Sequence, residues 1–100
     1  MLPFGFFVEF EARPGKEEEA ARFLEEAKTL VDDEPGTVTW FAFRLTPSSF
    51  RIFDAFATEE ARRIHLDGKV RQAIEARGDE LFATPPVITP VDLVAAKLSA

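Results

Sequence analysis

The chain has 100 residues, a net charge of -6 and no cysteine. This length allows one domain, residues 1–100, with a single hydrophobic core. The acidic balance excludes a phosphate-binding surface, because nucleic-acid affinity depends mainly on Lys and Arg, and no nucleic-acid partner is expected. The lack of cysteine excludes disulfides and thiolate chemistry and fits a cytoplasmic location. No apolar run approaches 18 residues and no signal-peptide pattern is present, so no membrane association is expected.

Hydrophobic periodicity predicts four strands and two helical regions. Strands are predicted where apolar side chains alternate or β-branched and aromatic residues gather, and helices where apolar residues recur every three or four positions. In chain order, we expect a strand over 4–12, a helix over 16–33, strands over 37–45 and 50–57, a helix from Thr58, a helical turn over 80–83 and a strand over 87–96.

The second helical region carries several local signals. Thr58 is a good N-cap, and acidic residues follow it in the first turn, where they favour the positive end of the helix dipole. Ala61, Ile64 and His65 are predicted to share one helical face. We expect Gly68 to end or bend the helix and Arg77-Gly78 to close it.

The order β-α-β-β-α-β predicts a ferredoxin-like α+β fold, in which two helices cover one face of a four-stranded antiparallel sheet. Pro90 lies inside the last predicted strand and lacks an N–H, so that strand should lie at an edge or contain a bulge. Both faces of the predicted sheet carry aromatic side chains, whereas the helices cover only one face. A second copy of the chain would bury the other face, so we expect a homodimer that packs sheet against sheet.

Two residues are the main candidates for chemistry, His65 and Asp54. His65 is the only histidine, and it would act as a proton donor or acceptor near pH 7, or alternatively lie half-buried with a backbone carbonyl as its partner. Asp54 would orient His65 or a substrate, or alternatively pair with Arg44 or Arg51 on the strand surface.

Trp40 and Arg44 are further candidates for a ligand site, but the sequence evidence for them is weaker. Trp40 and Arg44 share one strand face by their period-two spacing, so Trp40 would be a core residue or a pocket wall. Arg44 would hold an anionic oxygen or form a salt bridge at the rim. The His, Asp and Glu residues show no spacing typical of metal ligands, so no metal is expected.

Several short segments resemble the antibiotic biosynthesis monooxygenase family. The resemblance extends over nearly the whole chain, and the segments that carry it are Pro14-Gly15-Lys16-Glu17-Glu18, Glu34-Pro35-Gly36-Thr37, Phe53-Asp54-Ala55-Phe56, Glu59-Glu60-Ala61 with His65-Leu66, and the tail from Glu80 to Leu93. The resemblance implies a dimeric α/β barrel built from two ferredoxin-like sheets. Asp54 stands where the family usually has Glu.

The resemblance also implies a chemistry, in which O₂ oxidises an aromatic polyketide or quinol without metal or flavin, so no cofactor is expected. His65 would be the base and Arg44 the clamp, and Trp40, Phe41 and Phe43 would line a dry cavity for an aromatic small molecule. The chain contains no Asn and no Tyr, which the polyketide-oxidising members use, and the missing Asn argues against haem degradation. The alternatives are a non-catalytic dimeric ligand-binding or stress-associated module, and an isomerase or lyase that uses His65 as its base.

Overall fold

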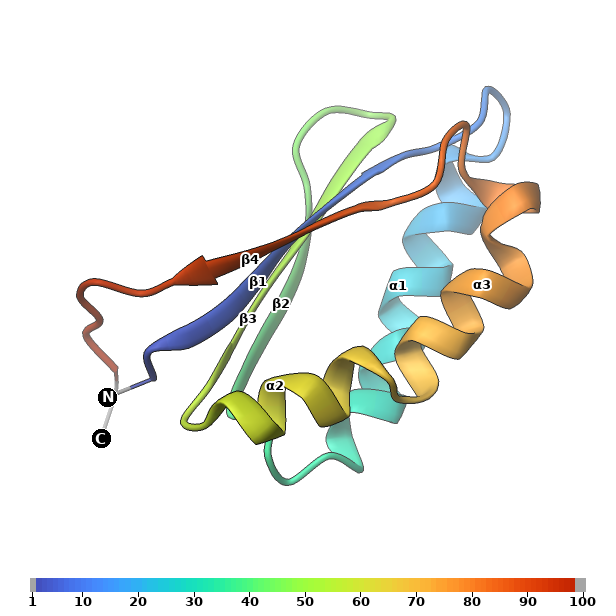
Figure 1. The fold of residues 1–100 in the computed structure, drawn as a ribbon. Coiled ribbons are helices and arrows are strands. Elements are labelled where there is room, and N and C mark those ends of the chain that lie inside the picture. The colour runs from blue at the N-terminus through green and yellow to red at the C-terminus, as the bar shows by residue number, and fades with distance from the viewer. Residues whose placement is uncertain (1, 99–100) are drawn as a thin grey trace.

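The structure is a computed structural model, and it describes residues 2–98. Its elements, in chain order, are β1 (Phe4–Glu11), α1 (Glu17–Asp32), β2 (Thr39–Arg44), β3 (Ser49–Phe56), α2 (Glu59–Leu66), α3 (Lys69–Leu81) and β4 (Val87–Asp92). The strands form one antiparallel sheet in the order β2-β3-β1-β4, and the helices lie against one face of it (Figure 1). The predicted ferredoxin-like fold is confirmed.

The core lies between the sheet and the helices. The alternating residues Phe6, Val8 and Phe10 of β1 face the helices and are buried, as their period of two predicts. Across the sheet they pair with Asp54, Ile52 and Phe50 of β3, which therefore share the same face. Asp54 is thus a buried charged side chain that the sheet presents among these apolar residues.

The helix that begins after Thr58 is divided at Gly68, as expected. The Thr58 side chain caps α2 by accepting a hydrogen bond from the Ala61 N–H at 3.1 Å. Ala61, Ile64 and His65, predicted to share one helical face, all border the same surface cleft, but His65 is buried whereas Ile64 is 60% exposed. Because α2 is short and lies at the end of the sheet, only a narrow stripe of it is covered.

The predicted end of the last helix at Arg77-Gly78 is wrong, because α3 continues to Leu81. The predicted separate turn over 80–83 is therefore partly the last turn of α3. Leu81 and Phe82 are almost completely buried in the core, and the Phe82 N–H donates to the Gly78 carbonyl at 2.8 Å. Burial of these two side chains outweighs the helix penalty of a glycine, which is about 1 kcal/mol.

The last strand is shorter than predicted, since it ends at Asp92 rather than at residue 96. Its partner β1 begins at Phe4, which pairs with Asp92, so no strand remains for the following residues to pair with. β4 lies at an edge of the sheet, which confirms the position expected from Pro90. The other expected boundaries are correct to within two residues.

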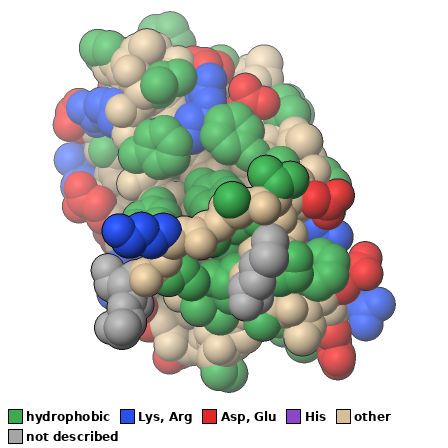
Figure 2. Space-filling model, turned by 90° about the vertical axis from the view of Figure 1, so that its left-hand side faces the viewer, with side chains coloured by type: hydrophobic (Ala, Val, Ile, Leu, Met, Phe, Trp, Pro, Cys, Tyr) green, Lys and Arg blue, Asp and Glu red, His purple; other side chains and the backbone are tan. Residues whose placement is uncertain are grey.

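The face of the sheet that the helices leave uncovered is rich in aromatic side chains, and we call it the outer face. Cross-strand pairing places Phe7, Phe41 and Phe53 there together. Phe41 is 59% exposed and the neighbouring Phe43 is 43% exposed. Figure 2 shows hydrophobic side chains gathered across this side of the molecule. In the described part of the chain, no helix is long and apolar enough to cross a membrane.

Candidate functional site

A buried imidazole lies between two carboxylates where α2 meets the sheet. His65 Nδ1 is 2.5 Å from Glu34 Oε1, and His65 Nε2 is 3.1 Å from Asp54 Oδ2. Asp54 is 1% exposed and His65 is 8% exposed, whereas the Glu34 side chain is 16% exposed. We call these three residues the carboxylate–histidine cluster. Its two carboxylates lie on opposite sides of the ring, one deep in the core and one near the surface.

Asp54 is held by the backbone of the neighbouring strand. Its Oδ1 accepts a hydrogen bond from the Phe6 N–H at 3.1 Å. Its Oδ2 lies 3.1 Å from His65 Nε2, and no other donor reaches it within residues 2–98. The contact is therefore an ion pair with residual acceptor capacity on Oδ2. A buried carboxylate oxygen that lacks a hydrogen-bond partner lowers the stability of the fold, unless a further donor can reach it.

Glu34 is placed by the turn that follows α1. The Glu34 carbonyl accepts from the Thr37 N–H at 3.1 Å, and the Thr37 hydroxyl donates to Glu34 Oε1 at 2.8 Å. Two glycines allow this turn to approach α2 closely. A Cβ on Gly36 would lie 2.9 Å from the Ala61 Cβ, and one on Gly68 would lie 3.0 Å from Glu34 Oε2. The sequence Glu34-Pro35-Gly36-Thr37 therefore has a second role besides ending the helix.

The environment raises the pKa of His65 above its ordinary value of 6.5. Burial alone lowers this pKa, because it disfavours the charged ring. The hydrogen-bonding and charge interactions with Asp54 and Glu34 favour the imidazolium and outweigh burial. The two carboxylates therefore favour the charged ring, in which each of the two nitrogens carries a proton that faces a carboxylate oxygen.

This arrangement predicts that the protein loses stability as the pH rises. A group whose pKa is higher in the folded state stabilises the fold fully below its unfolded pKa of about 6.5, and the contribution is lost as pH rises through the folded pKa. The chain has one His, no Cys and no Tyr, so His65 is the side chain whose ordinary pKa lies at the start of this interval, which extends upward from pH 6.5. We expect the urea midpoint to fall across this interval. In His65→Gln the fall should vanish, and an equal slope in that variant would contradict the assignment.

Two cavities meet at His65. The first, the inner cavity, has a volume of about 240 Å³ and lies between the sheet and α3. Its walls are mainly apolar, and its polar side chains are Asp54, His65, Arg71 and Glu75. The second, the outer cleft, has a volume of about 290 Å³ and is lined by Glu34, Thr37 and His65 together with exposed residues of α2. The imidazole thus lies between two separate spaces, both of which have exposed residues at their margins.

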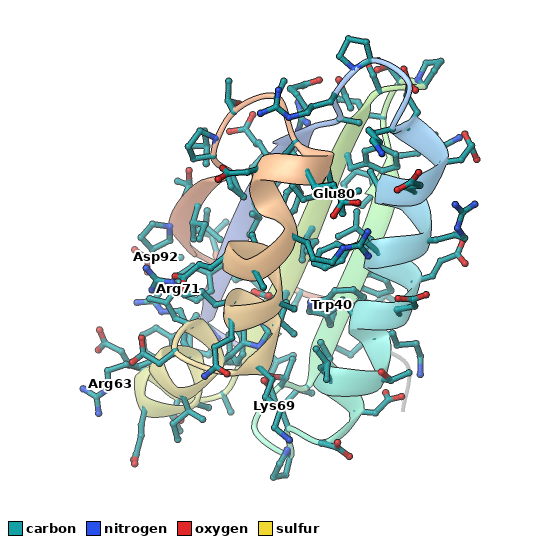
Figure 3. The ribbon with its side chains drawn as sticks, turned by 90° about the vertical axis from the view of Figure 1, so that its right-hand side faces the viewer. Trp40, Arg63, Lys69, Arg71, Glu80 and Asp92 are labelled. Carbon is teal, nitrogen blue, oxygen red and sulfur yellow. The ribbon has the colours of Figure 1, made fainter. Side chains whose placement is uncertain are left out.

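Trp40 and Arg44 lie in a different place, the rim groove between α1 and β2, whose volume is about 580 Å³. Figure 3 shows Arg71, which borders the inner cavity, and Trp40 on opposite sides of α3. Arg44 pairs with Glu18 at 3.2 Å and stacks over Phe50, as expected for a rim salt bridge. Trp40 packs against both parts of the core, and its buried indole N–H has no partner within residues 2–98.

The candidate residues predicted from the sequence therefore fall into three groups. His65 and Asp54 lie together, and the alternative pairing of Asp54 with Arg44 or Arg51 is wrong, because Arg51 pairs with Glu9 and Glu11 instead. A backbone partner for His65 is replaced by the two carboxylates. Trp40 and Arg44 line the rim groove. Phe41 and Phe43 lie on the outer face, although Phe43 also borders that groove at the sheet edge.

Solved structures of other proteins share the fold of this chain. No protein-family model matches the sequence, and a search of curated proteins found no match. Among solved structures, the NE2512 protein of unknown function from Nitrosomonas europaea is 45% identical, with a TM-score of 0.97 over 100% of this chain and 97% of that one. The chain belongs to the same family as this Nitrosomonas protein.

More distant structures carry the name that the sequence motifs suggested. A structure named antibiotic biosynthesis monooxygenase is 13% identical, with a TM-score of 0.78 over 92% of this chain and 99% of that one. The PA3566 protein from Pseudomonas aeruginosa, which does not carry that name, is 16% identical, with a TM-score of 0.79 over 95% of this chain and 97% of that one. At these identities the likeness concerns the fold, and at that level the resemblance is confirmed.

Proposed function

We propose that this protein is a cofactor-independent monooxygenase that oxidises a phenol or quinol with O₂ in the inner cavity. The observation that carries the proposal is the ion pair of Asp54 and His65 at the wall of a mainly apolar cavity. Asp54 lines this cavity, and its Oδ2, which lacks a hydrogen-bond partner within residues 2–98, is the acceptor that we assign to the hydroxyl of the substrate. The mainly apolar walls lower the local polarity around the pair, which strengthens its electrostatic interactions.

The chemistry needs one proton acceptor and no bound redox group. Asp54, supported by the His65 cation, removes the proton of the hydroxyl, and the resulting phenolate is electron-rich enough to reduce O₂. One oxygen atom then bonds to the ring and the other leaves as water, so that a phenol and O₂ give a quinone and water. His65 itself has both nitrogens in contact with carboxylates, so the base is the pair rather than the free imidazole expected from sequence.

An oxygen electrode tests this proposal directly. We expect oxygen uptake above the autoxidation blank with hydroquinone, catechol or naphthohydroquinone as substrate. Asp54→Asn should lower kcat/KM by about 10²- to 10⁴-fold, the range that a positioned acid or base supplies. Asp32→Asn, at an exposed pair with Lys28, is the matched control and should retain activity. No uptake with any of the three compounds would contradict the proposal.

A second candidate function is ligand binding without turnover in the rim groove. The unpartnered N–H of Trp40 could donate to a carbonyl oxygen, and Arg44 and Lys28 lie at the same groove. A quinone, which carries acceptor oxygens on a flat ring, has the matching chemistry. Saturable quenching of Trp40 fluorescence by menadione, without oxygen uptake in the previous assay, would favour this function.

We also propose that the active form is a homodimer that buries the outer face. The exposed aromatic side chains on this face support it, because monomers rarely expose a contiguous apolar patch of this kind. Each large aromatic residue buries roughly 150–250 Å² when covered, so a few per chain approach the area of a specific interface. A twofold arrangement is preferred, since it places the same patch on both copies.

A further inference from the structure

We propose that Glu34, His65 and Asp54 form a proton path that connects the inner cavity with the outer cleft, with Glu34 at its solvent end. Three observations carry this inference. The contacts are continuous, at 2.5 Å and 3.1 Å on the two sides of one ring. His65 lines both spaces, whereas Asp54 lines only the inner cavity and Glu34 only the outer cleft. Exposure also increases in one direction, from 1% at Asp54 to 16% at the Glu34 side chain.

The path keeps the net charge of the buried cluster constant when Asp54 accepts a proton. A proton that a ligand gives to Asp54 would add a positive charge at a side chain that is only 1% exposed. If the imidazolium simultaneously releases its Nδ1 proton to Glu34, and Glu34 passes it to water, the net charge of the cluster does not change. The cluster then contains protonated Asp54, a neutral imidazole with its proton on Nε2, and the Glu34 carboxylate.

The cycle closes without any other reactant. When the product or intermediate needs a proton, Asp54 returns the one that it holds, and Glu34 delivers a proton from water to the vacant Nδ1. One proton leaves and one proton enters, and no electron is transferred. The role of the ligand in these steps rests on the proposed function, but the connection between His65 and solvent does not.

Other charged groups near the ring are placed differently. Arg71 and Glu75 of α3 border the inner cavity, and Asp33 and Glu60 border the outer cleft. None of these four forms an ion pair with His65. The Thr37 hydroxyl is 3.5 Å from Nδ1, but it donates to Glu34 Oε1 at 2.8 Å and so holds the carboxylate in position. Glu34 is therefore the group that takes the Nδ1 proton.

The single histidine makes the test unambiguous, because every imidazole signal in a nitrogen-15 NMR spectrum belongs to His65. The experiment uses the protein without ligand and measures the pKa of the ring and the solvent exchange of its N–H protons. In Glu34→Gln we expect a lower pKa and exchange slowed by about 10²-fold, the lower end of what a positioned general base contributes. Glu34→Asp should restore part of both effects, and it serves as the second variant if Glu34→Gln does not fold.

Two control variants test whether Glu34, rather than Asp54, is the solvent end of the path. Asp54→Asn should change the Nε2 signal while the Nδ1 proton still exchanges quickly, because the solvent end remains intact. Glu80→Gln, at an exposed pair with Arg77, should change nothing. A lowered pKa with unchanged exchange in Glu34→Gln would make Glu34 a simple charge partner and overturn the path. Since no substrate is present, a failure of oxygen uptake and a failure of this test are separate results.

Discussion

Substituting Asp54 by alanine is expected to lower the free energy of unfolding by about 3–5 kcal/mol, the usual cost of removing one partner of a buried ion pair. Two losses combine in this variant. The Phe6 N–H loses its acceptor at 3.1 Å, and the His65 cation keeps only one of its two carboxylates. The measurement is urea unfolding at pH 6, where His65 is charged in the folded and the unfolded state.

Asp54→Asn separates these two losses. The amide oxygen can still accept from the Phe6 N–H, so this variant should lose less than the alanine variant. Asp32→Ala removes an exposed carboxylate that pairs with Lys28, and it should cost less than about 1 kcal/mol. An effect of Asp54→Ala no larger than that of Asp32→Ala would mean that the cluster does not contribute to stability.

Replacing Phe41 and Phe43 together with aspartate is expected to abolish dimer formation, or to weaken it by about 10³-fold or more. Two aromatic anchors at an interface each contribute about 2 kcal/mol or more, and the introduced charges repel across a twofold axis. The folded monomer should remain, because both side chains are largely exposed in the single chain. Light scattering during gel filtration measures the mass directly.

Ile64→Asp is the matched control for this prediction. Ile64 is as exposed as Phe41, but it lies on α2, away from the outer face. The control should therefore leave the mass of the assembly unchanged. A wild-type mass of one chain, 11.2 kDa, at micromolar concentration would contradict the proposed dimer.

Most of the fold could be predicted from the sequence because its signals are local. Alternation in β1, the three- and four-residue repeat in α1 and the cap at Thr58 each act within a few residues. The errors occurred where tertiary contacts decide the outcome. Burial of Leu81 and Phe82 extends α3 past Gly78, and the start of β1 sets the end of β4.

The candidate site was only partly predictable for a related reason. His65 and Asp54 stood out as the single histidine and an acid on a neighbouring strand. Glu34 did not, because it follows a helix 31 residues earlier in the chain and looks like part of a helix end. The signal in the sequence that pointed to Glu34 was the pair Gly36 and Gly68. The turn that holds Glu34 lies so close to α2 that these two positions leave little room for a side chain. Of the two roles expected for Arg44, an anion clamp or a rim salt bridge, the structure shows the second, with Glu18 as its partner.

The proline in β4 also determines how copies of the sheet can associate through their edges. The two edge strands are β2 and β4, and an open filament would need the β2 edge of one copy to pair with the β4 edge of the next. Pro90 offers no N–H to an approaching strand, so a complete ladder cannot form along β4. The β2 edge can still pair with another β2 edge, but such a contact joins only two chains. Growth through the sheet edges therefore stops at a pair, and fibre formation by this route is blocked.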